Sequence, residues 1–169
     1  MDKVAMPRGF LAVDPGLTGA LVILNEHGKY IDHLFMPAIK VGSKNRVNPA
    51  AIVAWLEKWP GLTHAYVENV HSMPSDGASR AFSFGHSSGV IHGVIAALGV
   101  PITPITPQSW KKHHNLLGTD KDAARSRATQ LFPDLRILDT KAKGQAIADA
   151  LFIGLFGIHK FTQSTLKVV

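Results

Sequence analysis

The stretch Phe10-Leu11-Ala12-Val13-Asp14-Pro15-Gly16-Leu17-Thr18-Gly19-Ala20-Leu21-Val22-Ile23-Leu24 decides how this chain folds. Two aliphatic runs flank the Pro15-Gly16 pair, a pattern that predicts a strand, a tight connection and a second strand. Asp14 then stands at the end of a buried strand, where a carboxylate is costly unless a cation, backbone donors or a metal ion pairs with it. Asp-Pro-Gly is also favoured turn chemistry, so the motif alone equally fits an Asp that serves only the turn.

The composition is that of an ordinary globular domain. The 169 residues are 46% hydrophobic and 18% charged, so we expect a single domain, residues 1–169, with its own core. The chain has no cysteine, which excludes disulfides and thiolate metal ligands. No apolar run approaches the roughly 20 residues of a membrane span, and no targeting segment is seen. We therefore expect a cytoplasmic protein without a membrane partner.

Working outward from the opening stretch, periodicity and turn residues predict five strands and five helices. The strands are expected at Phe10–Asp14, Ala20–Leu24, Tyr30–Met36, Thr63–Glu68 and Pro101–Ile105. The first helix is expected to begin at Asn48-Pro49 and to end at Pro60-Gly61. The other four are expected at 79–98, 108–117, 120–131 (capped by Thr119) and 143–158. A polar, basic loop is expected at 40–47. Three strands followed by helix–strand units predict an α/β fold with a mixed five-stranded sheet.

Only three acidic residues lie clearly in apolar settings: Asp14, Glu68 and Asp149. Glu68 ends the fourth predicted strand, and Asp149 lies inside a strongly apolar helix. Two strand-end acids converge if their strands are neighbours, and a helix crossing those ends supplies the third. Such a cluster repels itself unless a cation binds it, and its hard oxygen ligands favour Mg²⁺ or Mn²⁺. Two such ions about 3.5–4 Å apart suit phosphodiester hydrolysis.

The net charge of +6 suits a polyanionic partner. The basic excess is concentrated between Gln108 and Gln145. Its members are Lys111, Lys112, Lys121, Arg125, Arg127, Arg136, Lys141 and Lys143. From the residues alone, this segment is either a nucleic-acid surface or a solvated helix face.

A glycine stripe runs along the helix expected at 79–98. Gly85, Gly89 and Gly93 recur at every fourth position. Because each glycine costs about 1 kcal/mol in a helix interior, the stripe indicates that another backbone approaches closely. That backbone belongs either to this chain or to a second subunit.

Taken together, these segments resemble the RuvC-like Holliday junction resolvases of the ribonuclease H-like superfamily, the phage and chloroplast members above all. The resemblance rests on pieces that occur in family order from Leu11 to Gly157. They are 12–20 (AVDPGLTGA), 66–70 (YVENV), Phe84-Gly85 with the glycine stripe, 100–112 (VPITPITPQSWKK), 121–125 (KDAAR), Leu131-Phe132-Pro133, and Asp149-Ala150-Leu151 with Gly154.

The resemblance implies a ribonuclease H-like fold and a homodimer in a bacterial or phage-infected cell that cleaves four-way DNA junctions with Mg²⁺. Two ions per site are expected, and Mn²⁺ is expected to substitute. Asp14, Glu68 and Asp149 would be the catalytic metal ligands. The predicted DNA-binding residues are Lys111, Lys112, Arg125 and Lys143, with His71 and Met73 in the loop that approaches the junction centre.

One position departs from the family pattern. A fourth acid or a histidine is typical about one helical turn before the last acid, and Gln145 stands there. Gln145 offers a carbonyl oxygen to a metal but no charge. Two alternatives therefore stay open: a branched-DNA-binding module with weak or lost cleavage, and a nuclease for other branched DNA or RNA–DNA hybrids. The chain is too short for a two-domain sugar kinase or actin-like ATPase, and its nine histidines lack zinc-ligand spacing.

Overall fold

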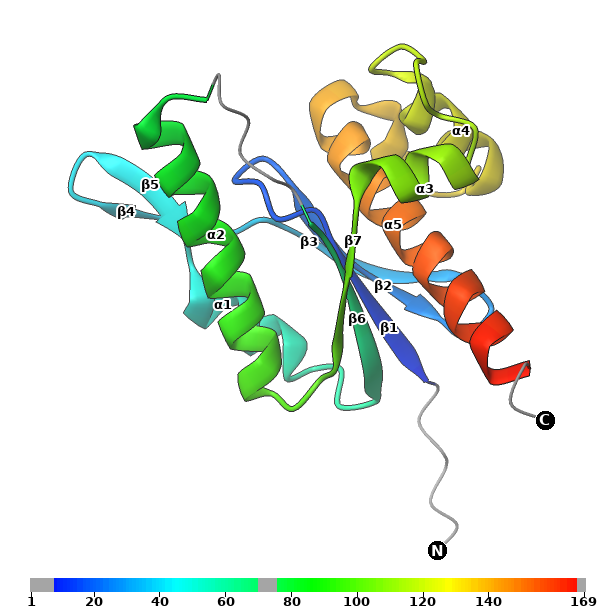
Figure 1. Ribbon diagram of the computed structural model, residues 1–169, viewed down its shortest axis with the longest axis horizontal. Helices are drawn as coiled ribbons and strands as arrows, with labels where there is room; N and C mark the ends of the chain where they lie inside the picture. Colours follow the sequence, from blue (N-terminus) through cyan, green and yellow to red (C-terminus); the bar gives the residue numbers. More distant parts are fainter. Residues whose placement is uncertain (1–7, 70–75, 167–169) are drawn as a thin grey trace, which may run out of the picture.

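The computed structural model describes residues 8–69 and 76–166, and a mixed five-stranded sheet lies at its centre (Figure 1). Its order is β3-β2-β1-β6-β7, with β1 and β2, and β2 and β3, antiparallel, and with β6 parallel to both β1 and β7. The strands are β1 Gly9–Val13, β2 Ala20–Asn25, β3 Tyr30–Phe35, β6 Leu62–Glu68 and β7 Ile102–Ile105. The predicted fold class, a mixed sheet flanked by helices, is confirmed.

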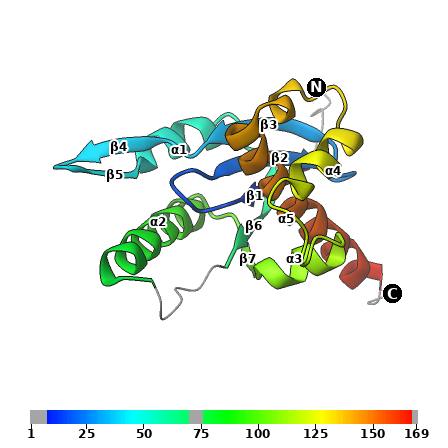
Figure 2. The same cartoon turned by 90° about the horizontal axis from the view of Figure 1, so that it is seen from above.

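Helices cover both faces of this sheet (Figures 1 and 2). They are α1 Pro49–Leu56, α2 Ala78–Ala97, α3 Pro107–His113, α4 Ala123–Leu131, the 3₁₀ helix η1 Arg136–Asp139 and α5 Lys141–Leu166. The expected cap of α1 is present, because Oδ1 of Asn48 accepts a hydrogen bond from the Ala51 amide at 3.3 Å. Thr119 does not cap α4, which begins later; its hydroxyl instead donates to the Leu116 carbonyl at 2.9 Å. None of the helices in the described ranges is long and apolar enough to span a bilayer.

Strand alternation builds one core on each face of the sheet. Leu11 and Val13 of β1 pack with α1 and α2, whereas Phe10 packs with α3, α4 and α5. Ala12 shares the α5 face, since its Cβ lies 2.8 Å from where a side chain at Gly154 would begin. The same alternation directs the side chain of the next residue, Asp14, towards α5.

Helix α5 crosses the sheet at two glycines. A Cβ on Gly154 would come within 2.6 Å of a Leu24 methyl group, and a Cβ on Gly157 would overlap the ring of Tyr66. These contacts lock α5 closely onto β1, β2 and β6. We call these close contacts at Gly154 and Gly157 the seat of α5. They fix where the side chains of α5 lie along the sheet.

The expectation of a loop at residues 40–47 was wrong. Strands β4 Ala38–Val41 and β5 Lys44–Val47 form a separate antiparallel hairpin. Gly42 occupies the first turn position with φ of 61°, as tight hairpin turns favour. The hairpin lies against the N-terminal half of α2, a tertiary contact that the local sequence does not reveal.

Candidate active site

The ends of two parallel neighbours, β1 and β6, bring Asp14 and Glu68 together. Their register pairs Ala12 with Tyr66 and Val13 with Val67. One step further along the strands, Asp14 comes alongside Glu68. Both side chains follow the alternation to the α5 face of the sheet. The sharp turn after Asp14 needs Gly19, because a Cβ there would lie 2.8 Å from the Asp14 carboxyl carbon and would overlap its carbonyl oxygen.

Helix α5 supplies the third acid to the same place. Asp149 precedes the seat at Gly154 by five residues, about 7.5 Å along the helix axis at 1.5 Å per residue. Ala12 contacts α5 at Gly154, and Asp14 lies two residues further along β1. At 3.3 Å per residue, this distance along the strand is about 6.6 Å. The two displacements match, so the acids meet at one end of the sheet.

All three carboxyl groups have raised pKa values. Burial, followed by the charges of Asp14 and Glu68, raises the pKa of Asp149 to about 7. Burial also raises the pKa of Asp14 and of Glu68, the latter with a contribution from Asp14. The cluster is therefore both desolvated and self-repelling, which is the electrostatic setting that attracts a cation.

Within the described residues, each carboxylate has one hydrogen-bond donor. The Gly16 amide donates to Asp14 Oδ1 at 3.3 Å, and Nε1 of Trp110 donates to Glu68 Oε1 at 2.8 Å. Nε2 of Gln145 donates to Asp149 Oδ1 at 2.9 Å. The other amide atom of Gln145, Oε1, is buried and has no hydrogen-bond partner in the described part of the chain.

Helix α3 contributes two residues to the site. Trp110 is only 1% exposed, so its indole N–H needs the acceptor that Glu68 provides. Lys111, the next residue, lowers the pKa values of all three acids through its charge. From the sequence, Lys111 was predicted to bind DNA, and no role was predicted for Trp110. The available signal was general: a tryptophan that becomes buried needs an acceptor for its indole N–H.

Two cavities flank the Gln145–Asp149 pair. The larger, about 620 Å³, is lined by Asp14, Thr18, Met36 and Lys143 together with that pair. The smaller, about 280 Å³, is lined by the same pair with Trp110, Lys111, Asp120 and Lys121. Lys143 also lies over the Phe35 ring, with Nζ 5.3 Å from its centroid. Lys111 and Lys143 thus line different cavities beside Asp149.

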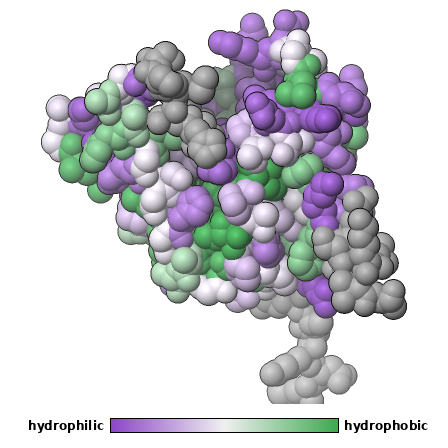
Figure 3. Space-filling view, in the orientation of Figure 1, coloured by the Kyte–Doolittle hydropathy of each residue, from purple (hydrophilic) through white to green (hydrophobic). Residues whose placement is uncertain are grey.

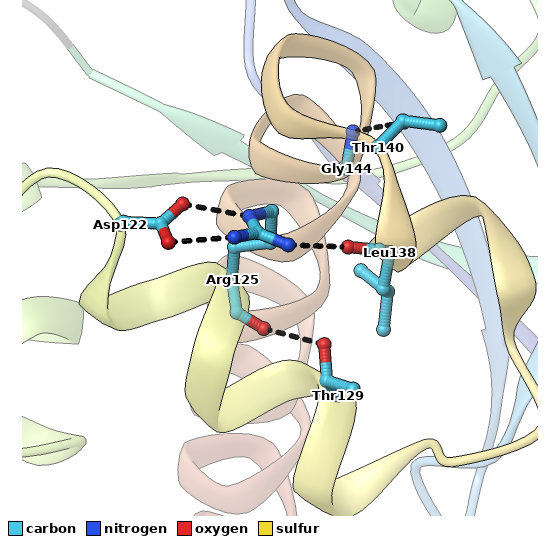
Figure 4. Close-up of polar contacts among 6 residues, drawn as sticks. All are labelled: Asp122, Arg125, Thr129, Leu138, Thr140 and Gly144. Carbon is cyan, nitrogen blue, oxygen red and sulfur yellow. Dashed lines mark hydrogen bonds and ion pairs between the residues drawn. The ribbon is translucent and has the colours of Figure 1, made fainter.

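The other predicted DNA contacts lie apart from the acids. Arg125 is bound within the protein: its guanidinium donates twice to Asp122, both at 2.6 Å, and once to the Leu138 carbonyl at 2.9 Å (Figure 4). Its side chain is 17% exposed. Lys112 is exposed at the end of α3. His71 and Met73 lie outside the described residues.

The donor set of the site fits a divalent cation of the Mg²⁺ class. It consists of three carboxyl groups with raised pKa values and the amide oxygen of Gln145, which has no hydrogen-bond partner in the described residues. In the arrangement described, residues 8–69 and 76–166 contain no group of three or more His, Asp or Glu side chains already gathered to hold an ion. Holding one ion together would require the acids to move closer to one another.

The order of the sheet and the helices on its two faces define the ribonuclease H-like class of fold. More particularly, the chain has the fold of RuvC. It matches T. thermophilus RuvC in complex with a Holliday junction substrate with a TM-score of 0.63 at 14% identity, over 92% of this chain and 96% of that chain. It matches a second Thermus thermophilus RuvC structure with a TM-score of 0.59 at 16% identity, over the same shares. No protein-family model and no curated protein sequence matches. The resemblance seen in the sequence is thus confirmed for the fold.

Proposed function

We propose that the protein is a structure-selective endonuclease that resolves four-way DNA junctions by divalent-metal-dependent, symmetric phosphodiester hydrolysis. The observation that carries the proposal is the electrostatic coupling of Asp14, Glu68 and Asp149, which come from three separate elements to one end of the sheet. A buried cluster of three acids has no evident structural purpose, since it destabilises the fold at neutral pH. The similar RuvC structure was determined with a Holliday junction substrate, which supports the choice of DNA.

In this proposal the acids and Gln145 Oε1 hold Mg²⁺, two ions per site, with Mn²⁺ as a substitute. The metal would supply an activated water and stabilise the leaving oxygen. Trp110 orients the Glu68 carboxylate through its hydrogen bond. Lys111 and Lys143 stand beside the acids and would hold the phosphates on either side of the cleaved bond. Lys112 and Arg125 would contact phosphates farther along the DNA.

We also propose a homodimer, because symmetric incision of a junction needs two active sites related by a twofold axis. The glycine stripe of α2, formed by Gly85, Gly89 and Gly93, supports a dimer. A Cβ built on any of the three meets no atom within 4 Å in the described residues. The glycine stripe therefore does not serve packing against the described parts of this chain, and we assign it to a second copy. Sedimentation showing only monomers, with junction free and bound, would contradict this assignment.

Incubating the protein with an end-labelled immobile four-way junction tests the function directly. We expect paired nicks at symmetric positions in Mg²⁺ or Mn²⁺, none in EDTA, and none on a linear duplex of the same sequence. The second candidate, a junction binder without cleavage, is favoured by Gln145, which places an uncharged amide beside Asp149. A shifted but intact junction in Mg²⁺ and in Mn²⁺ would establish that candidate instead.

A further inference from the structure

A basic face of the hairpin lies against the first half of α2, away from the basic segment at 108–145. Lys44 and Arg46 of β5 point to this helix. Nζ of Lys44 donates to the hydroxyl of Ser79 at 3.1 Å, and Arg46 donates to the hydroxyl of Ser83 at 3.3 Å. The Arg46 guanidinium also lies 5.4 Å from the centroid of the Phe82 ring. Both cations are thus held in place by uncharged groups.

Three other arginines of the described chain are instead paired with acids. Arg80 pairs with Asp76, Arg125 with Asp122 and Arg136 with Asp139. Within residues 8–69 and 76–166, neither Lys44 nor Arg46 forms an ion pair with a carboxylate. The hairpin itself, 38–47, carries three cations and no acid. Its charge is oriented but not neutralised, which is the condition for receiving an anion from outside.

The hairpin begins at the wall of the acid-lined cavity. Met36, which lines that cavity, donates its amide to the Gly19 carbonyl at 3.0 Å, and β4 starts two residues later. The Asn48 amide closes the base of the hairpin on the Pro37 carbonyl at 2.8 Å. Seen from above, the hairpin and α2 lie on one side of the strand ends, and α3, α4 and α5 lie on the other (Figure 2). In Figure 3 hydrophilic and hydrophobic residues mix over the hairpin side, whereas hydrophilic residues dominate over α4.

We propose that Lys44 and Arg46 form a second DNA-backbone contact, which binds the phosphates of a junction arm on the side of the active site opposite Lys111. This rests on the proposed function and adds a surface to it. A four-residue strand is about 13 Å long, the axial length of roughly four base pairs, so the hairpin can follow one arm as it leaves the cavity. Ser79, Ser83 and Phe82 act as positioning residues, because they fix the cations without removing their charge.

A nucleic acid suits this face better than a second copy of the chain. Two copies meeting here about a twofold axis would place Lys44 and Arg46 near the same cations of the partner, with no acid of the hairpin to compensate. A polyanion meets no such repulsion. The glycine stripe, which we assign to the dimer, begins two residues after Ser83 and lies on a different face of α2.

The test removes the two charges and keeps their hydrogen-bonding ability. Lys44→Gln/Arg46→Gln is compared with Lys29→Gln/Lys58→Gln, which removes two exposed cations at the far end of the sheet, near the β2–β3 turn and after α1. Binding of a labelled immobile four-way junction is measured in EDTA over a series of salt concentrations. The hairpin variant should lower the slope of log affinity against log salt by roughly 1.8, or 0.9 for each lost phosphate contact. The control pair should keep the wild-type slope.

Three results would overturn the inference. An unchanged slope in the hairpin variant, with wild-type junction binding intact, overturns the second contact and leaves the proposed function standing. A shift from dimer to monomer in sedimentation of that variant assigns the face to a second copy. A wild-type protein that does not bind the junction overturns the proposed function and this inference with it. If the double variant does not fold by circular dichroism, Lys44→Gln alone should lower the slope by roughly 0.9.

Discussion

Gln145 donates a 2.9 Å hydrogen bond from Nε2 to Oδ1 of Asp149, one turn further along α5. The bond uses the donor end of the amide and leaves the acceptor end, Oε1, buried without a partner in the described residues. A cation at Asp149 would favour the reverse orientation, with the amide oxygen towards the metal. In this structure Gln145 therefore has the orientation that competes with an ion.

From this pair we predict the effect of Gln145→Asp. A fourth carboxylate should lower the Mg²⁺ concentration needed for half-maximal junction cleavage, because it adds charge at a ligand position. It should also tighten Mn²⁺ binding measured by calorimetry, a reading that does not depend on cleavage. In EDTA at neutral pH the variant should melt below wild type, since a fourth acid adds repulsion. Identical metal dependence of the two proteins would show that position 145 is not a ligand position.

Asp14→Asn should abolish metal-dependent cleavage and leave junction binding in EDTA largely intact. The substitution keeps the shape of the side chain but removes the charge that a divalent cation needs. Asp139→Asn is the matched control, because Asp139 lies in η1 and pairs with Arg136 at 2.8 Å. Product analysis on gels should show wild-type nicking for the control. Cleavage by Asp14→Asn at the wild-type rate would refute the assignment of the active site.

The pKa of Asp149 predicts a dependence of stability on pH in the absence of metal. A carboxyl whose pKa rises from 3.8 to about 7 on folding binds more protons in the native state, so its contribution to stability falls as pH rises from about 4 to 7. Over that window Asp149→Asn should gain stability relative to wild type, by about 4 kcal/mol at most for a shift of roughly three units.

Urea unfolding of both proteins in EDTA between pH 4 and pH 8 measures this difference. The comparison is needed because burial lowers the pKa of His114 to about 4, which changes wild-type stability in the opposite direction. The histidine contribution cancels between wild type and Asp149→Asn. Parallel stability curves for the two proteins would mean that Asp149 has an ordinary pKa.

Trp110→Phe should weaken cleavage by misorienting Glu68. The variant loses the N–H that donates to Glu68 Oε1 at 2.8 Å, and a buried carboxylate without its donor costs about 1–3 kcal/mol. A double-mutant cycle with Glu68→Gln should give a coupling energy for unfolding of roughly 0.5–3 kcal/mol. Additive effects would show that the hydrogen bond does not contribute to stability, and unchanged cleavage would show that it does not position Glu68.

Lys111→Ala/Lys112→Ala should reduce the salt slope of junction binding by roughly 1.8, the effect of two lost phosphate contacts. Arg125→Ala is informative beside it. The structure ties Arg125 to Asp122 and to the Leu138 carbonyl, so its removal should lower the unfolding free energy as well. If Arg125→Ala lowers stability but keeps the wild-type slope, the arginine serves the packing of α4 on η1 and not DNA. An unchanged slope in the double lysine variant would make those lysines part of a solvated face.

The sequence predicted the sheet and the three acids because those features follow from local patterning. Strand alternation and turn residues around Pro15-Gly16 act over a few residues, and an acid in an apolar run is visible without any tertiary contact. The hairpin at 38–47 was missed because its polar residues resemble a loop until α2 is beside them. The hydrogen bond of Arg125 to the Leu138 carbonyl could not be foreseen, because that carbonyl comes from another element. The role of Trp110 likewise depends on how α3 meets β6.

The seat of α5 on the sheet also limits how this protein can change over time. Because Gly154 and Gly157 fix the helix against Ala12, Leu24 and Tyr66, the interval from 149 to 154 sets where the acid faces. One inserted or deleted residue in that interval would turn Asp149 by about 100° around the helix axis. Descendant sequences can exchange many outer side chains of α5, but they can inherit the site only if they keep the spacing. The number of residues between 149 and 154 is therefore constrained more strongly during sequence divergence than the identity of the residues between them.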